Sequence, residues 1–345
     1  MSHALLSPSS SERWINCPPS AKENTDSDTG SSYAQQGTDA HTLCEFKVNQ
    51  ALGHKVRDPT ENLTYFDDEM ADCTDAYCEF VMEQVQLAKQ SCSDPLILVE
   101  QRLDFTRWVA GSFGTSDCII VADGTLTVID FKYGVGILVE ADNNSQMRMY
   151  ALGALNLFES LYDIQKIRMA IFQPRRDNVS IAELTKDELL HWADETLIPA
   201  ATLASKGEGE YKAGKHCQFC KIKAICRKRT EYNFQMAQYE FAVPNTLDNE
   251  EISVILERAD TFVGWVNDVK EYALEQALSG QVFPGFKVVE GRSNRRYINN
   301  ESVAEAVKNA GYDPYEKKLL GITAMTKLLG KKKFENILGS FIEKP

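Results

Sequence analysis

The sequence predicts an α/β fold in which a mixed sheet is flanked by helices. Short apolar runs rich in β-branched residues predict strands, and longer segments with apolar residues at helical spacing predict helices around them. The 345-residue chain is 43% hydrophobic and 25% charged, which is ordinary for a globular protein that buries a core. We expect the core to run in the order helix, three strands, helix, strand.

Four segments are predicted strands, because each is a short apolar run bounded by turn residues. The third is the clearest, since the Asp123-Gly124 pair before it is a strong hairpin-turn pattern. Gly111 and Gly114 interrupt the second. The predicted strands are 96–103, 108–121, 125–133 and 164–173.

The predicted helices carry apolar residues at helical spacing, and two helices begin with a capping box. Ser9 and Glu12 form the first box, ahead of a short N-terminal helix, and Thr185 and Glu188 form the second. A polar loop is expected over residues 22–36. The longer predicted helices are 37–52, 67–90, 140–161, 185–205 and 249–278.

Three parts are expected along the chain. Residues 1–235 form the core with its N-terminal helix and a cysteine cluster, residues 236–280 form a long helix or linker, and residues 281–345 form a small basic α/β domain. Within the last part, the expected elements are a strand at 282–290 and helices at 301–310 and 323–338.

The net charge of −13 argues against a histone-like nucleic-acid binder. Residues 281–345 nevertheless contain 12 Lys+Arg and 7 Asp+Glu, a net of +5, so the first 280 residues carry −18. An acidic body with a basic tail suits an enzyme whose carboxylates bind metal and whose tail approaches phosphate; a solvated helical face is the alternative. The predicted DNA-contacting residues are Arg292, Arg295, Arg296, Lys331, Lys332 and Lys333.

The sequence has no apolar run of the ~18 residues that span a bilayer and no pattern of a secretion signal. We therefore expect a cytoplasmic protein that makes no membrane contact. Its nine cysteines are then expected to be reduced rather than paired in disulfides.

Two predicted strands carry the residues with catalytic chemistry. Asp117 lies in the second, and Asp130 and Lys132 lie in the third. Residues two apart on a strand share a face, so Asp130 and Lys132 face one site while Ile129 and Phe131 face the core. Two carboxylates suit Mg²⁺ or Mn²⁺, and the lysine positions or deprotonates the attacking water.

Residues on the neighbouring elements strengthen this pattern. His41 lies on the preceding helix in a G-x-x-x-H sequence, and imidazole is a common metal ligand. Gln146 and Tyr150 are four residues apart on the following helix, so they share one helix face. Glu100 is either an accessory carboxylate or an ordinary strand residue.

A compact cysteine triple, Cys217-x2-Cys220-x5-Cys226, has the spacing of a metal or cluster site. A tetrahedral site needs a fourth ligand. His216 is adjacent but poorly placed, and Cys17 is far away in the sequence.

The sequence resembles the RecB-like branch of the PD-(D/E)XK nuclease superfamily, which includes the AddB nuclease domain and the CRISPR-adaptation exonucleases, and within it an uncharacterised phage and prophage family. The resemblance covers about residues 5–230 and implies a restriction-endonuclease-like core. It implies that His41, Asp117, Asp130 and the Phe131 carbonyl bind Mg²⁺ or Mn²⁺, and that Lys132, with Gln146 and Tyr150, completes the catalytic site.

The same resemblance selects Cys17 as the fourth cysteine. It implies a [4Fe-4S] cluster held by Cys17, Cys217, Cys220 and Cys226, which staples the N-terminal helix to the far end of the core. A structural Zn²⁺ with the same four ligands is the alternative, because both metals accept four thiolates.

The expected function is a DNA exonuclease or end-processing nuclease of phage recombination or replication, acting in the cytoplasm of a bacterial host. DNA ends are the expected substrate, and a phage single-strand annealing or binding protein and self-association are further expected partners. The alternatives are a catalytically silent DNA-binding or assembly module, and the same chemistry used in CRISPR-type spacer processing.

Overall fold

The computed structural model describes residues 4–24, 32–235, 247–291, 297–315 and 319–342. The chain divides into two compact units, Met1–Phe283 and Pro284–Pro345. Among the described helices, none combines the length and apolar character that a bilayer-spanning segment requires.

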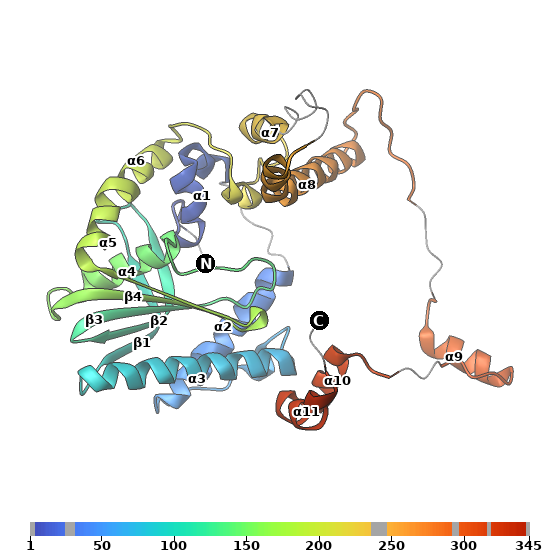
Figure 1. Ribbon diagram of the computed structural model, residues 1–345, viewed down its shortest axis with the longest axis horizontal. Helices are drawn as coiled ribbons and strands as arrows, with labels where there is room; N and C mark the ends of the chain where they lie inside the picture. Colours follow the sequence, from blue (N-terminus) through green and yellow to red (C-terminus); the bar gives the residue numbers. More distant parts are fainter. Residues whose placement is uncertain (1–3, 25–31, 236–246, 292–296, 316–318, 343–345) are drawn as a thin grey trace. The chain divides into compact units, whose positions relative to one another are not determined.

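The first unit is built on a five-stranded mixed sheet with helices on both sides (Figure 1). The spatial order of the strands follows the sequence, and every neighbouring pair is antiparallel except β3 and β4. The prediction of a mixed α/β fold is therefore confirmed. The strands are β1 (Leu96–Asp104), β2 (Phe113–Ala122), β3 (Gly124–Phe131), β4 (Ile164–Gln173) and β5 (Asn178–Thr185).

The parallel pairing of β3 and β4 determines where the next helix lies. Parallel neighbours need a crossover connection that returns the chain to the same end of the sheet. Helix α4 (Ser145–Phe158) supplies this crossover, and the side chain of Asn144 caps it by accepting from the Met147 amide at 3.1 Å. The chain that follows β3 therefore returns across one face of the sheet as α4 before it enters β4.

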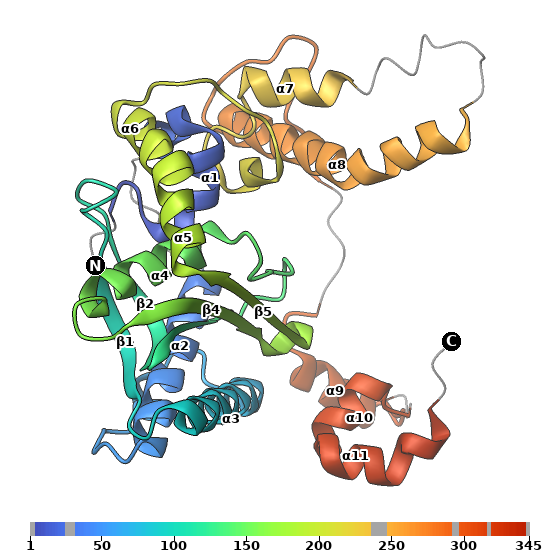
Figure 2. The same cartoon turned by 60° about the vertical axis from the view of Figure 1, so that its left-hand side comes forward.

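Each face of the sheet has its own hydrophobic core. Ile129 and Phe131 point to the core under α2 (Ser32–Ala51) and α3 (Asp68–Ser91). Val128, on the opposite face, packs in the core under α4 and the helices after β5. This alternation confirms the predicted orientation of the third strand. The helices after β5 are α5 (Lys186–Trp192), the π-helical turn η5 (Ala193–Leu197) and α6 (Ile198–Lys206). Figure 2 shows α4, α5 and α6 on the Val128 side of the sheet.

Helix α4 lies unusually close to β1. A Cβ atom at Gly153 would stand 2.5 Å from a ring carbon of Phe105 and 2.9 Å from Cβ of Leu103. Real Cβ atoms do not approach so closely, so glycine is what allows the helix to reach this position.

The N-terminal segment packs against α4 and α6. Trp14 is fully buried, and its indole N–H donates to the Ser7 carbonyl at 3.1 Å. The Ser11 hydroxyl is 2.6 Å from that of Ser145, at the start of α4. The segment comprises η1 (Pro8–Ser10), α1 (Ser11–Asn16) and η2 (Pro18–Asn24).

Helix α8 (Asn249–Leu278) packs against α7 (Arg227–Phe234). The rings of Phe234 and Trp265 meet edge to face at 5.5 Å, and Arg229 is ion-paired with Asp268. The remaining short turns of this unit are η3 (Thr60–Asn62), η4 (Pro174–Arg176) and η6 (Lys215–Phe219).

The predicted strand at 282–290 is wrong, and with it the α/β assignment of the C-terminal part. In the described part of Pro284–Pro345 the regular elements are all helical. Val282, Phe286 and Val289 are exposed, and a strand needs a paired neighbour for its backbone groups. The elements are α9 (Asn300–Asn309), α10 (Ile322–Leu329), α11 (Lys331–Leu338) and η8 (Gly339–Phe341).

Other predicted boundaries also need correction. Residues 108–112 form turns instead of the start of β2, and the helix expected at 140–161 spans only Ser145–Phe158. The helix expected at 323–338 is split at Gly330, whose φ of 72° ends α10. Strand β5 was not predicted at all.

Candidate metal centre and cysteine pocket

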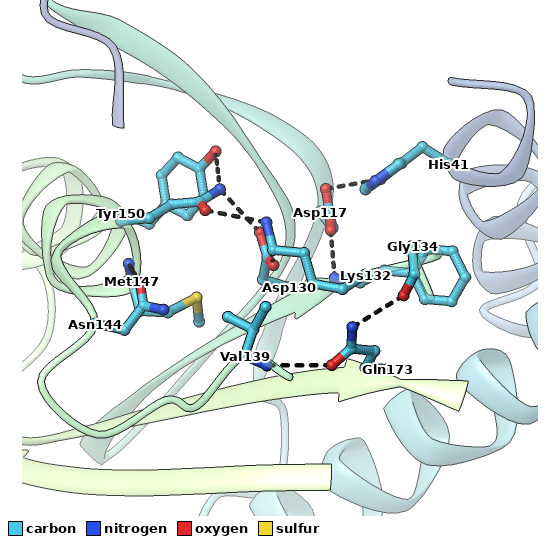
Figure 3. A network of polar contacts seen from close by, with 12 residues as sticks. His41, Asp117, Asp130, Lys132, Gly134, Val139, Asn144, Met147, Tyr150 and Gln173 are labelled. Carbon is cyan, nitrogen blue, oxygen red and sulfur yellow. Dashed lines mark hydrogen bonds and ion pairs between the residues drawn. The ribbon is translucent and has the colours of Figure 1, made fainter. Parts of the chain in front are cut away.

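His41, Asp117, Asp130 and Lys132 come together at one end of the sheet (Figure 3). Asp117 Oδ1 lies 3.2 Å from His41 Nδ1, which α2 brings from one side. Asp130 Oδ2 lies 2.9 Å from Lys132 Nζ. All four residues were predicted as site residues, and the fold places them as two adjoining charge pairs.

The backbone of β3 holds the Asp117 carboxylate in place. Asp117 Oδ2 accepts a hydrogen bond of 2.6 Å from the Phe131 amide, between Asp130 and Lys132 in the sequence. The Asp117 carboxylate on β2 is therefore hydrogen-bonded to the segment that carries Asp130 and Lys132.

Helix α4 completes the network with the predicted Gln-x-x-x-Tyr pair. Gln146 Nε2 donates to Asp130 Oδ1 at 3.2 Å, and its Oε1 accepts from Lys132 Nζ at 3.0 Å. The same Nε2 lies 3.1 Å from the hydroxyl of Tyr150. A single amide thus orients both members of the Asp130–Lys132 pair.

Glu100, whose role the sequence left open, also belongs to this centre. It lies on β1 between the residues that pair with Cys118 and Ser116, so it faces Asp117. One ligand atom from each of His41, Glu100 and Asp117 lies within 4.8 Å of the other two. The φ of Glu100 is +51°, a left-handed conformation that costs free energy in a non-glycine residue and often marks a functional position.

The two central aspartates respond to burial in opposite ways. Burial raises the pKa of Asp117, but His41 and the Phe131 amide outweigh it and hold the net pKa below its usual value. For Asp130, burial is the larger influence and raises the pKa despite the adjacent Lys132. Asp130 is therefore the carboxylate that gains most from an additional cation.

The outer groups of the centre have shifted pKa values as well. Burial lowers the pKa of His41, yet the Asp117 carboxylate prevails and raises it to about 9. Burial and Asp117 together raise the pKa of Glu100 to about 7. For Lys132, burial lowers the pKa but Asp130 raises it above the usual value, so this side chain stays cationic.

This set of atoms fits a hard divalent cation. Carboxylate oxygens and a neutral imidazole are suitable ligands for Mg²⁺ or Mn²⁺. Asp130 Oδ2 is buried and, within the described part of the chain, accepts no hydrogen bond of good geometry, although Lys132 is near. Lys132 neutralises the charge of this buried oxygen, and a bound cation would supply the contact of good geometry that it lacks. The Phe131 carbonyl as an extra ligand stays a prediction.

The four predicted cluster cysteines line one pocket. Cys17 ends α1, Cys217 lies in η6, Cys220 follows it and Cys226 caps α7. The Gly214 amide donates to Cys217 Sγ at 3.4 Å, and Asn24 Nδ2 donates to Cys220 Sγ at 3.6 Å. The fold therefore joins Cys17 to the distant triple.

His216 lines the pocket too, but its ring is engaged elsewhere, because Nε2 contacts the Lys212 carbonyl at 2.9 Å. Its neighbour in the pocket, Arg13, is only 8% exposed and donates to the backbone and hydroxyl oxygens of Ser20. In the described part of the chain, no carboxylate forms an ion pair with Arg13. Burial lowers the pKa of Arg13, whereas Cys220 and Cys17 raise it.

A buried guanidinium without an anion is unfavourable. Four protonated thiols offer no negative charge, whereas a metal–tetrathiolate group is anionic. The pocket therefore fits an iron–sulfur cluster or a zinc ion better than it fits free thiols. Burial raises the pKa of Cys17 and Cys217, which opposes thiolate formation without a metal.

The predicted DNA-contacting residues are placed only in part. Arg292, Arg295 and Arg296 lie outside the described residues. Lys331, Lys332 and Lys333 begin α11; Lys333 is exposed, and the side chains of the other two lie outside the described part.

The chain is similar to a solved structure described as "Crystal structure of SSO0001". The two are 14% identical, the match covers 56% of this chain and 98% of that chain, and the TM-score is 0.26. A family profile matches residues 3–345 of the chain. The protein is therefore a member of the family described as "Protein of unknown function (DUF2800)".

Proposed function

We propose that this protein is a metal-dependent deoxyribonuclease of the RecB-like PD-(D/E)XK type, hydrolysing phosphodiester bonds with an activated water. The observation that carries the proposal is the joint placement of Asp117, Asp130 and Lys132 with the bridging amide of Gln146. A carboxylate pair beside a buried lysine supplies both a cation site and a positive charge for a phosphate.

Asp117, Asp130 and His41 would hold the Mg²⁺ or Mn²⁺, with Glu100 as a further ligand or as a support for His41. A divalent cation bound there polarises a phosphoryl oxygen and makes water a better nucleophile at neutral pH. Among the described residues, His41, Glu100 and Asp117 form the group whose ligand atoms all lie within 4.8 Å of one another, and Asp130 lies outside that group, so Glu100 is a strong candidate for a ligand of the same ion.

Lys132 acts as a fixed positive charge. Its ammonium is held by Asp130 at 2.9 Å and by Gln146 at 3.0 Å. Asp130 raises its pKa above the usual value after burial has lowered it, so it is a poor proton acceptor in this state. Lys132 is therefore proposed to orient the attacking water and neutralise phosphate charge.

Burial raises the pKa of Tyr150, so its hydroxyl stays protonated. Its hydroxyl lies 3.1 Å from Gln146 Nε2, which holds the amide in the orientation that bridges Asp130 and Lys132. Tyr150 is proposed to position Gln146 and, through it, Asp130 and Lys132.

We further propose that the cysteine pocket holds a [4Fe-4S] cluster with a structural role. Arg13 supplies positive charge beside it, and the amide of Gly214 and side chain of Asn24 donate hydrogen bonds to sulfur, as is typical around such clusters. A zinc ion remains the alternative, which iron and zinc analysis of anaerobically purified protein distinguishes.

The proposed substrate is linear DNA, and the proposed setting is end processing in phage recombination or replication. A single-strand annealing or binding protein is the proposed partner. Cleavage at a CRISPR-type spacer would use the same chemistry, and DNA binding without cleavage would indicate an assembly module.

The test is cleavage of end-labelled single- and double-stranded linear DNA with Mg²⁺ or Mn²⁺, beside a closed circular DNA. Asp130→Asn should lower cleavage by about a hundredfold to a thousandfold, whereas Asp123→Asn, at an exposed turn between β2 and β3, should not. If metal-loaded wild type binds DNA but cuts none of these substrates with either cation, the nuclease proposal fails and the binding-module alternative replaces it.

A further inference from the structure

The chain between Lys132 and Gln146 forms a loop that begins and ends at the candidate metal centre. Lys132 Nζ contacts Gln146 Oε1 at 3.0 Å, so the two ends of the loop are joined by the centre itself. Residues 134–142 of this connection are here named the 134–142 loop, and both of its ends are tied to the candidate centre.

The tip of the 134–142 loop is apolar and faces solvent. Val135, Ile137 and Leu138 are 47%, 43% and 48% exposed. Scattered apolar residues are common on surfaces, but three large aliphatic side chains within four positions, on a loop whose ends join the candidate centre, form a local patch.

The loop is nevertheless held firmly by side chains of the sheet. The buried Gln173, at the end of β4, donates to the carbonyls of Gly134 at 3.0 Å and Ile137 at 2.8 Å. Its Oε1 accepts from the Val139 amide at 3.3 Å (Figure 3). Asn178, at the start of β5, donates to the Val139 carbonyl at 2.9 Å.

A second anchor lies just beyond, where the Ala141 amide donates to the Ser180 hydroxyl at 2.9 Å. These bonds fix the loop backbone while leaving the aliphatic side chains outside. The tip is thus preorganised, and a ligand that covers it meets little cost of ordering the loop.

A positive charge lies on the turn that anchors the loop. Arg176 is exposed on η4, between Gln173 and Asn178, both of which hydrogen-bond to the loop. Exposed aliphatic side chains on the loop and a cation on the turn that anchors it suit nucleic acid, because base faces contact aliphatic side chains while phosphates contact arginine.

We propose that the 134–142 loop contacts unpaired bases next to the scissile phosphate, so that the protein selects single-stranded DNA or frayed DNA ends over intact duplex. The inference rests on the proposed nuclease function. In a duplex the base faces are stacked on one another and unavailable to Val135, Ile137 and Leu138. In an unpaired strand they can pack on these side chains while Arg176 holds the backbone.

The experiment compares wild type with the triple variant Val135→Ser, Ile137→Ser and Leu138→Ser, whose positions are exposed. The matched control replaces Leu157 and Leu161 by Ser; both are exposed, and Leu157 lies about 16 Å along α4 from Gln146 at 1.5 Å per residue. The probes are a single-stranded oligonucleotide, the same oligonucleotide with a central abasic stretch, and a blunt duplex.

Binding is measured by fluorescence anisotropy with Ca²⁺, and cleavage with Mn²⁺. We expect the triple variant to bind the base-bearing single strand about tenfold more weakly, as loss of base contacts implies. Its binding of the abasic strand should be unchanged, and the control variant should match wild type on all three probes.

Two results would overturn the inference. One is equal loss of binding on base-bearing and abasic strands, which would place the effect in the fold or the backbone contacts. The other is unchanged binding by the triple variant. In that case the loop assignment fails, and the nuclease proposal survives if wild type still cleaves DNA. If wild type cleaves no DNA, the nuclease proposal fails, and the anisotropy comparison decides on the loop.

Discussion

The metal centre and the cysteine pocket bury charge in opposite ways. In the metal centre each aspartate already has a cationic partner, Asp117 with His41 and Asp130 with Lys132. In the cysteine pocket the buried Arg13 has only Ser20 oxygens as hydrogen-bond partners among the described residues, and anionic charge must come from the thiols. The paired aspartates can release and rebind a cation, whereas the charge of Arg13 in the pocket stays unbalanced unless the proposed metal–thiolate group is present.

This difference suits the proposed roles of the two regions. A catalytic cation is bound by oxygen and imidazole ligands that exchange with water, while four thiolates keep a metal permanently. Removing one ligand should therefore mainly reduce activity in the first region and mainly reduce stability in the second.

The largest expected effect is the loss of activity in Asp130→Asn. The change keeps the shape of the side chain but removes the charge that balances Lys132 and would bind the cation. Cleavage of linear DNA should fall by about a hundredfold to a thousandfold, with a circular dichroism spectrum like wild type. Mn²⁺ should raise the Tm of wild type but not of the variant. Retention of full activity would remove Asp130 from the catalytic centre.

A large effect on stability is expected for Cys17→Ser. The variant should lose most of its bound iron or zinc and melt about 10 °C lower, because metal binding free energy contributes to folding. Cys92→Ser is the matched control, since Cys92 is half-buried at the end of α3 and does not line the pocket. Equal metal content in both variants would exclude Cys17 as a ligand.

A smaller effect is expected for Arg13→Met, which should change the free energy of unfolding differently in metal-loaded and in metal-free protein. In metal-loaded protein the change removes the counter-ion of an anionic group, so it should lower the free energy of unfolding by about 1–2 kcal/mol. In metal-free protein it removes an uncompensated buried charge and should be neutral or stabilising. Urea unfolding of both forms measures the difference, and equal destabilisation in both would contradict the charge argument.

The smallest expected effect is a pH dependence of metal-free protein. The pKa of folded His41 is about 9, against 6.5 for an unperturbed histidine. Its stabilising interaction is therefore fully present below pH 6.5 and is lost as the pH rises through about 9. Tm should fall by a few degrees over this window in wild type, but the His41-dependent part should be absent in His41→Asn. Affinity for Mn²⁺ should rise over the same window, because only neutral imidazole binds metal.

Local patterns predicted most of the framework. Strand β4 and helix α8 were predicted with the bounds that the structure has. Proline, capping residues and apolar periodicity mark the ends of an element in its own sequence, so no distant contact is needed to recognise them. Strand β5 was missed although its side chains alternate in burial. Val179 and Ile181 are exposed on this edge strand, so the usual apolar-in pattern was weak.

The arrangement of the site depends on contacts that no local pattern contains. The two-residue spacing of Asp130 and Lys132 predicted a shared face, but the bridging role of Gln146 needs the crossover of α4. Glu100 reaches the centre through a left-handed backbone conformation, which its residue type gave no reason to expect. Gln173 looks like an ordinary strand end until its bonds to Gly134 and Ile137 are seen.

The way Cys17 joins the far end of the first unit has a consequence for biosynthesis. Cys17 and Cys217 are 200 positions apart, whereas the segment from β2 through β4 contains Asp117, Asp130, Lys132 and α4. As the chain leaves the ribosome, strands β2, β3 and β4 can pair well before Cys226 has been made. Closing the pocket across so long a segment must therefore come late, and Cys17 has none of its three partner cysteines until the end of the first 226 residues has been made.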